Sequence, residues 1–130
     1  MQVLQPPGWP RPRGYANGIA AEGRLVFVAG QIGWDAGQTI VSDDLVEQLR
    51  QTLENTLAVL REAGAGPQHV ARMTWYVTDK GEYLARAREI GETYRAVMGR
   101  HFPAMAVVEV KALIEDRAKV EIETTAVVPP

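Results

Sequence analysis

Residues 101–128, HFPAMAVVEVKALIEDRAKVEIETTAVV, are the stretch that decides the fold. They hold two apolar, β-rich segments, residues 104–113 and 119–128, which the polar connection IEDRA separates. Two such segments joined by a loop of moderate length are typical of a β-hairpin. The stretch therefore predicts that the chain ends in two paired strands.

Alternation along these two segments divides their side chains between two faces of a sheet. We expect one face, which is almost wholly apolar, to lie under helices: Ala106, Val108, Val110, Ala112 and Ile114, then Val120, Ile122, Thr124, Ala126 and Val128. The other face mixes charges with apolar residues: Met105, Val107, Glu109, Lys111 and Leu113, then Lys119, Glu121, Glu123, Thr125 and Val127. Two interpretations of the mixed face stay open, a half-wet surface with cross-strand ion pairs or a subunit interface whose charges line a cavity.

Two further strands are predicted upstream. Residues 24–32, RLVFVAGQI, form a nearly continuous apolar run, which indicates a strand buried on both faces. Gly30 inside this run indicates a bulge or a close approach of another group to the backbone. Residues 72–78, RMTWYVT, predict the second strand.

Two helices are predicted between these strands. The first begins after Ser42, a good N-cap, and ends at Gly64. Its core-facing stripe is formed by leucines at helical spacing: Leu45, Leu49, Leu53, Leu57 and Leu60. The second helix runs over residues 81–98 and ends at Gly99. The order β, α, β, α, β, β predicts an α+β sandwich, with two helices on one face of a mixed sheet.

Length and charge limit the organisation and the partners. A chain of 130 residues predicts a single domain spanning 1–130, in which residues 1–14 form an extended arm because 5–14 carry four prolines. With 14 basic and 16 acidic residues the net charge is −2, so no nucleic-acid partner is expected. No apolar run reaches membrane-spanning length and the N-terminus does not resemble a signal peptide, so we expect a soluble cytoplasmic protein with no membrane partner.

The inventory of chemically versatile side chains is small. The chain has no cysteine, which excludes disulfides, thiolate catalysis and metal sites that need cysteine ligands. Two histidines, His69 and His101, cannot form a multi-histidine metal cluster. We therefore expect no metal and no cofactor.

Four motifs taken together resemble the Rid family, also called YjgF/YER057c/UK114. They are the closing stretch beginning HFPAMAVVEV, RGYANGI at residues 13–19, VAGQIG at residues 28–33 and the helix LVEQLRQTLENTLAVLREAG at residues 45–64. The resemblance covers nearly the whole chain. It implies a chorismate-mutase-like α+β fold and a homotrimer with a central β-barrel, with a small-molecule ligand in a cleft at each subunit boundary.

The resemblance also implies a chemistry and the residues that perform it. The best-studied members hydrolyse reactive enamines and imines, such as 2-aminoacrylate, to keto acids and ammonia. Glu121 matches the family's site glutamate and would orient and deprotonate the attacking water. Tyr15 matches the tyrosine of the cleft, and Gly30 keeps the glycine of the first long strand.

Four positions of the implied site depart from the family's pattern. Met105 stands where the family's arginine grips the substrate carboxylate, and Ala29 stands where a serine precedes Gly-Gln-Ile. Gly91 falls where an asparagine is often found, and Val107 where a cysteine is. Methionine is apolar and flexible, and it supplies neither the charge nor the paired donors of a guanidinium.

A few further residues keep two interpretations. Trp34 is either an aromatic wall of the cleft or a packing tryptophan. Four arginines are either anion anchors for a ligand or solvated surface groups: Arg11, Arg13, Arg24 and Arg72. We expect Trp75 and Phe102 to be structural.

These observations predict a RidA-like hydrolytic imine deaminase with an altered substrate and poor activity on 2-aminoacrylate. Met105 and Glu121 are expected to share one cleft. The alternative is a non-catalytic trimeric protein that binds or senses a small molecule in the same clefts. A 2-aminomuconate deaminase and an RNA-directed translation inhibitor have less support, because cationic anchors and basic clusters are not obvious in the sequence.

Overall fold

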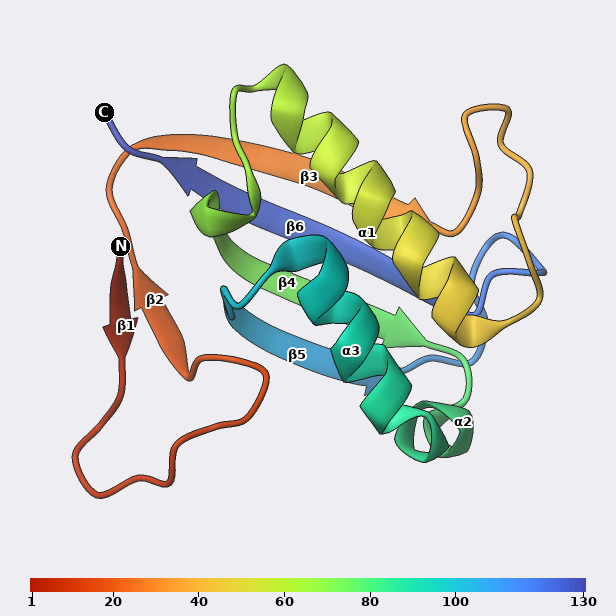
Figure 1. Ribbon diagram of the computed structural model, residues 1–130, viewed down its shortest axis with the longest axis horizontal. Coiled ribbons are helices and arrows are strands. Elements are labelled where there is room, and N and C mark those ends of the chain that lie inside the picture. Colours follow the sequence, from red (N-terminus) through yellow and green to blue (C-terminus); the bar gives the residue numbers. More distant parts are fainter.

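A four-stranded mixed sheet carries helices on one of its faces (Figure 1). The computed structural model describes residues 1–130. The strands of this sheet are β3 (Arg24–Ile32), β4 (Val70–Val77), β5 (Ala104–Glu109) and β6 (Val120–Val128). Their order is β3-β6-β4-β5, with β4 and β5 parallel and the other pairs antiparallel. The α+β fold with a mixed sheet, expected from the sequence, is confirmed.

The predicted terminal hairpin is wrong. β4 lies between β5 and β6 and pairs with both of them. Strand β5 ends at Glu109, and residues 110–119 carry the chain past β4 to the start of β6. Passing one strand covers about 10 Å, which a loop of this length spans easily. Alternation indicates which side chains share a face, but it does not indicate which strands are neighbours.

Helix α1 (Leu45–Glu62) begins two residues later than the sequence suggested. Its N-cap is Asp44, whose carboxylate accepts a hydrogen bond from Glu47 N at 3.0 Å. Ser42 instead accepts a hydrogen bond from the backbone N–H of Asp44. Gly64 follows the helix with a positive φ of 70°, as expected for a glycine that ends a helix.

The predicted second helix is two helices, α2 (Lys80–Ala85) and α3 (Ala87–Met98), which meet at Arg86. The guanidinium of Arg86 forms ion pairs with Asp44 at 2.8 Å and with Glu89 at 2.8 Å. It therefore links the start of α1 to the start of α3. The break arises from this tertiary contact, which helical periodicity does not reveal.

The ion pairs of Arg86 predict a pH-dependent stability. The hydrogen bond from Arg86 holds the pKa of Asp44 below its ordinary value of 3.8 and that of Glu89 below 4.5. A lowered carboxyl pKa stabilises the fold above the ordinary value, and this stabilisation is lost as the pH falls through the folded-state pKa. Arg86→Leu should lower the melting temperature at pH 7, and the deficit should shrink as the pH approaches 3.

Thermal unfolding between pH 7 and pH 3 checks this prediction. Arg88→Leu is the matched control, since Arg88 lies two residues further along, in α3, with its side chain 92% exposed, and pairs only with Glu92. A difference in melting temperature between wild type and Arg86→Leu that stays constant from pH 7 to pH 3 would show that the ion pairs do not stabilise the fold.

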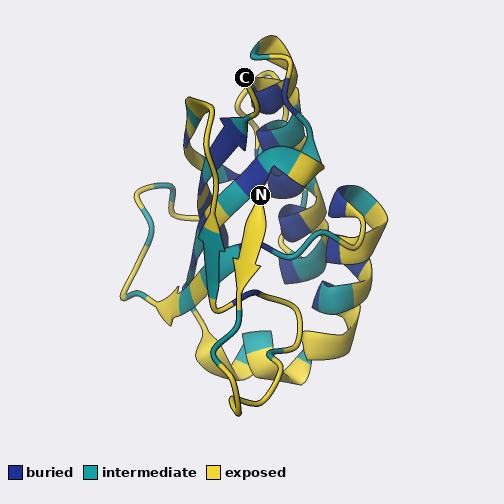
Figure 2. Cartoon of the chain, turned by 90° about the vertical axis from the view of Figure 1, so that its left-hand side faces the viewer, coloured by how far each residue is buried: buried dark blue, intermediate teal, exposed yellow.

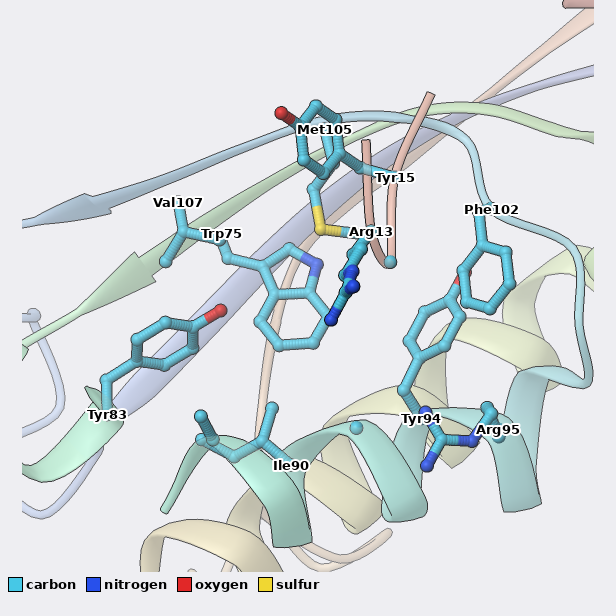
Figure 3. A pocket seen from close by; sticks show the side chains of 13 residues that line it. Arg13, Tyr15, Trp75, Tyr83, Ile90, Tyr94, Arg95, Phe102, Met105 and Val107 are labelled. Carbon is cyan, nitrogen blue, oxygen red and sulfur yellow. The ribbon is translucent and has the colours of Figure 1, made fainter. Parts of the chain in front are cut away.

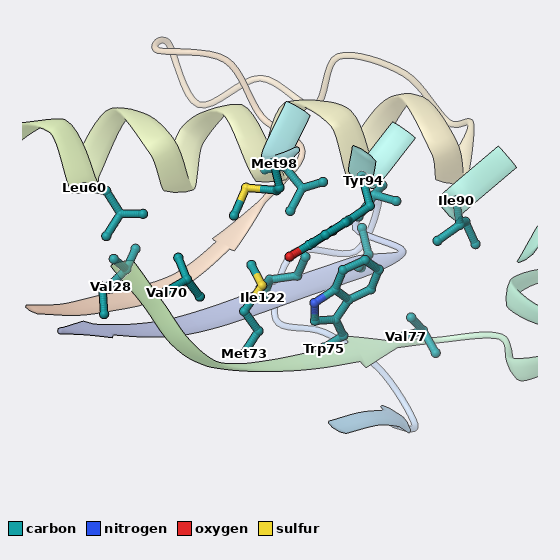
Figure 4. Packing of buried hydrophobic residues seen from close by; sticks show 14 of the residues in the cluster. Val28, Leu60, Val70, Met73, Trp75, Val77, Ile90, Tyr94, Met98 and Ile122 are labelled. Carbon is teal, nitrogen blue, oxygen red and sulfur yellow. The ribbon is translucent and has the colours of Figure 1, made fainter. Parts of the chain in front are cut away.

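The core lies between the helices and the sheet (Figure 4). On β6, Val120, Ile122, Thr124 and Ala126 are buried, which confirms the helix-facing side predicted for this strand. The leucine stripe of α1 is also confirmed: Leu45, Leu49, Leu53 and Leu60 are buried, and Leu57 is half-buried against them.

The faces predicted for β5 are reversed. Met105 and Val107 pack against the core, whereas Ala106 and Val108 lie on the exposed side. The contrast in polarity that suggested the opposite assignment came from Glu109 alone, which is the last residue of this short strand. Glu109 has a local structural role, because its carboxylate accepts a hydrogen bond from Lys80 N at 2.7 Å at the start of α2.

Strand β3 is not buried on both faces, as its apolar run had suggested. Leu25 is 58% exposed and Phe27 is 73% exposed, on the face opposite the helices. The register with β6 shifts between Val28 and Gln31. This irregularity confirms the bulge, one of the two features predicted at Gly30.

The N-terminal arm contains a strand of its own. Strand β1 (Gln2–Leu4) pairs with β2 (Gly18–Ala20) in a separate two-stranded sheet. Figure 2 shows β1 exposed along its length beside the main sheet. No helix of the chain is both long enough and apolar enough to cross a bilayer.

Candidate functional site

A cavity of about 380 Å³ opens between the sheet, the helices α2 and α3 and the N-terminal segment (Figure 3). Four residues singled out from the sequence line it together: Tyr15, Gly91, Met105 and Val107. Tyr15 comes from the N-terminal segment, Gly91 from α3, and the other two from neighbouring inward positions on β5. The reversed face of β5 is what places Met105 and Val107 in this cavity.

Aromatic and aliphatic side chains form most of the remaining wall: Trp75, Tyr83, Ile90, Tyr94 and Phe102. The sequence interpretation treated Trp75 and Phe102 as structural and did not identify Tyr83 as a site residue. A helical spacing connects several wall positions on α2 and α3, but the same spacing is typical of an ordinary core stripe. The wall is thus continuous with the core. It differs from an ordinary core because the cavity that it lines opens to the surface.

The aromatic rings on one side of the wall contact one another. The rings of Tyr94 and Phe102 stack with centroids 5.8 Å apart, and Trp75 lies 6.1 Å from Tyr94. The hydroxyl of Tyr94 donates a hydrogen bond to the backbone oxygen of His101 at 2.8 Å. Burial raises the pKa of Tyr94, so this phenol stays protonated and does not act as a base.

The cavity has no carboxylate and no histidine among its lining residues. Its charged groups are two guanidiniums, Arg13 and Arg95. Of the arginines considered from the sequence, only Arg13 lines this cavity. Arg24 instead donates to the backbone oxygen of Ala63 at 2.6 Å. The cavity alone can hold an apolar ligand with negative charge, but it offers no group to activate water.

A second set of candidates lies at the bulge of β3. Glu121 lies on β6 and pairs in register with Ile32 of β3. Its carboxylate lies beside Gly30. A Cβ added at Gly30 would lie 2.5 Å from Glu121 Oε2, so a side chain here would displace the carboxylate. Ala29 precedes Gly30 on an exposed part of the strand. This bulge therefore presents a carboxylate beside open backbone.

Within a single chain, Glu121 and Met105 lie on opposite faces of the sheet. Glu121 lies between the buried Val120 and Ile122, so it points to the face of the sheet opposite the helices. Met105 points to the helix-covered face. The expectation that one face carries both side chains is wrong, because β5 presents the other of its two faces to the helices.

Trp34 belongs neither to the cavity around Met105 nor to the group at the β3 bulge. It forms an isolated bridge with Ile40 and packs against the small cluster of Ile32, Ile40 and Ala118. Its backbone oxygen accepts a hydrogen bond from Asn55 at 2.8 Å. Within the chain Trp34 packs in this cluster and is not a wall of the cavity.

Comparison with known proteins assigns the chain to a family. A family model described as Endoribonuclease L-PSP matches residues 10–128. The structure of YyfB from Yersinia pestis, a protein of the conserved Rid family, is similar with a TM-score of 0.86 and 32% identity, covering 98% of each chain. The chain belongs to the Rid family.

Other Rid relatives are similar over most of their length. A 2-iminobutanoate/2-iminopropanoate deaminase of Salmonella typhimurium is 34% identical over 116 residues, which are 87% of this chain and 86% of the relative. The structure of E. coli TdcF with bound serine has a TM-score of 0.70 and 29% identity, covering 98% of this chain and 99% of TdcF. These similarities extend beyond the motifs to the whole Rid fold.

Proposed function

We propose that this Rid protein is a hydrolytic imine or enamine deaminase with an altered substrate. The observation that supports this best is the division of its candidate residues into two complementary sets. One set, around Met105, forms a cavity without a water-activating group, and the other, around Glu121, presents a carboxylate without a cavity. The similarity to a relative named 2-iminobutanoate/2-iminopropanoate deaminase supports the reaction class.

We propose that a homotrimer brings the two sets together at each subunit boundary. Leu25, Phe27 and Val108 are exposed on the sheet face opposite the helices, and such apolar side chains favour association. The carboxylates of Glu121 and Glu123 lie on the same face of β6. Association through this face would place Glu121 of one subunit at the mouth of the cavity of the next.

The proposed reaction needs one positioned base. Water adds to the electrophilic carbon of the C=N group, forming a C–O bond as Glu121 takes a proton from that water. Proton transfer to nitrogen then allows the C–N bond to break, and the products are a carbonyl compound and ammonia. Because imines are intrinsically reactive, an oriented water molecule and one general base are sufficient for catalysis.

Met105 determines which imines are suitable. We propose that it replaces an arginine that binds the substrate carboxylate in relatives. Loss of a charge-paired contact of this kind costs about 2–5 kcal/mol. Small 2-imino acids and 2-aminoacrylate, which are too short to contact much of the aromatic wall, should therefore be poor substrates, while imines with a large apolar side chain that contacts this wall should be better ones.

Ammonia release from freshly generated imines tests this function. We expect hydrolysis of imines that carry a large apolar side chain above the rate in buffer. With 2-iminopropanoate, kcat/KM should be about 10²–10³-fold below that of the Salmonella relative assayed beside it. Equal turnover of 2-iminopropanoate by the two proteins would contradict the altered specificity.

A second candidate function is a trimeric binding or sensor protein. The absence of a carboxylate or histidine from the cavity lining favours it. A sensor should raise its melting temperature when a ligand is added, yet release no ammonia from any imine. This combination of results would replace the deaminase proposal.

A further inference from the structure

The cavity holds two guanidinium groups for which the chain supplies no counter-charge. Arg13 and Arg95 line it, and neither takes part in the five ion pairs of the protein. No acidic side chain lines the cavity with them. Two cations facing one largely apolar space form a favourable environment for an anionic group of a ligand.

The guanidinium of Arg95 lies beside Gly91, one turn earlier on α3. The guanidinium folds back along the helix, and its Nη1 lies 3.2 Å from where a Cβ of residue 91 would be. Figure 3 shows Arg95 directed back along α3. A side chain at position 91 would occupy this wall of the cavity, so the glycine allows a cation to lie there.

An independent observation at the same cavity also indicates a ligand. Trp75 is 3% exposed, and its indole Nε1–H has no hydrogen-bond partner in the chain. Buried donors without a partner are rare because their desolvation is costly. Figure 3 shows the indole nitrogen on the edge of the ring that faces Met105 and Arg13. A ligand oxygen near Arg13 would satisfy this donor once the flexible Met105 side chain moves aside.

We propose that Arg95 and Arg13 form the anion anchor of this site, in place of an arginine at position 105, and that Trp75 Nε1–H contributes to it. Met105 and the aromatic wall then hold an apolar body. The ligand class is a 2-imino acid, or its 2-oxo acid product, with a bulky apolar or aromatic side chain. A cavity of about 380 Å³ is large enough for a phenyl group together with a carboxylate.

This inference rests on the proposed function for the choice of the imine and its 2-oxo acid product, but binding tests it without turnover. Three probes separate the contributions: 3-phenyl-2-oxopropanoate, 1-phenylpropan-2-one, which lacks the carboxylate, and pyruvate, which lacks the ring. Calorimetry should show that wild type binds 3-phenyl-2-oxopropanoate more tightly than either of the other probes.

Single replacements Arg95→Gln and Arg13→Gln then identify the anchor. Each should weaken binding of 3-phenyl-2-oxopropanoate by about 10- to 100-fold and leave binding of 1-phenylpropan-2-one unchanged. Arg88→Gln is the matched control, because Arg88 lies on α3 but points to solvent with its side chain 92% exposed. This control should bind all three probes as wild type does.

Three results would overturn the anchor. The first is wild type binding none of the probes. The second is unchanged preference for the carboxylate in both arginine variants. The third is loss of oligomerisation without loss of that preference, which would mean that these arginines pair with Glu121 of a neighbouring copy. If the arginine variants keep the preference for the carboxylate while wild type releases ammonia, the anchor is wrong and the deaminase proposal stands. If the variants lose this preference while wild type releases no ammonia, the anchor stands and the deaminase proposal is wrong.

Discussion

Replacing Glu121 with glutamine is expected to lower the rate of the proposed imine hydrolysis by about 10²–10⁴-fold, the range by which a positioned general base accelerates a reaction. Glutamine keeps the size of the side chain and its fit beside Gly30, but it cannot take a proton from water. Binding of 3-phenyl-2-oxopropanoate should change little, since the carboxylate acts on water and not on the ligand anion. The measurement is ammonia release, with oligomeric state checked by light scattering.

Glu123→Gln is the matched control for this variant. Glu123 lies on the same face of β6, and its carboxylate accepts a hydrogen bond from the Tyr76 hydroxyl at 2.7 Å. A glutamine oxygen can accept the same bond, so this variant should retain wild-type activity. Full activity in Glu121→Gln, or an equal loss in both variants, would show that Glu121 is not the base.

Replacing Met105 with tryptophan should abolish both ligand binding and hydrolysis. The larger ring would fill the space in front of Trp75 and prevent the imine carbon from reaching its reactive position, and displacement by about 1 Å already costs roughly 10²-fold in rate. Since Met105 is half-buried at the open side of the cavity, the extra volume can project into the cavity and not into the core. The measurements are calorimetry with 3-phenyl-2-oxopropanoate and ammonia release.

Met105→Leu is the control for volume. Leucine is apolar and close to methionine in size, and such substitutions usually cost less than about 1.5 kcal/mol. Binding and activity near wild-type levels are expected. Loss of activity in the leucine variant would mean that the sulfur itself is required, which the proposed site does not explain.

Local features of the fold could be predicted from the sequence, whereas features fixed by distant contacts could not. The leucine stripe of α1, the terminating Gly64 and the bulge at Gly30 depend on residues near each other in the chain. The place of β4 between β5 and β6 depends on long-range pairing. The break at Arg86 likewise depends on Asp44, which is distant in sequence.

The candidate site shows the same division. The resemblance of the sequence motifs to the Rid family pointed to four residues that line one cavity: Tyr15, Gly91, Met105 and Val107. Tyr83, Tyr94 and Arg95 were not identified as site residues, because their spacing on α2 and α3 is also that of a core stripe or a solvent-facing turn. The placement of Met105 and Glu121 on one face failed because Glu109 made the face of Met105 look polar, whereas this carboxylate lies at the end of β5 and accepts a hydrogen bond from Lys80 N.

The proposal that each site combines two subunits is tested most directly by mixing two inactive variants. Met105→Trp and Glu121→Gln are unfolded together in equal amounts and refolded, so that mixed oligomers form. If each site uses the cavity of one subunit and Glu121 of another, random assembly restores both parts in about one site in four, and about a quarter of wild-type ammonia release should return. Activity that stays at the level of the separate variants would contradict a site shared between subunits.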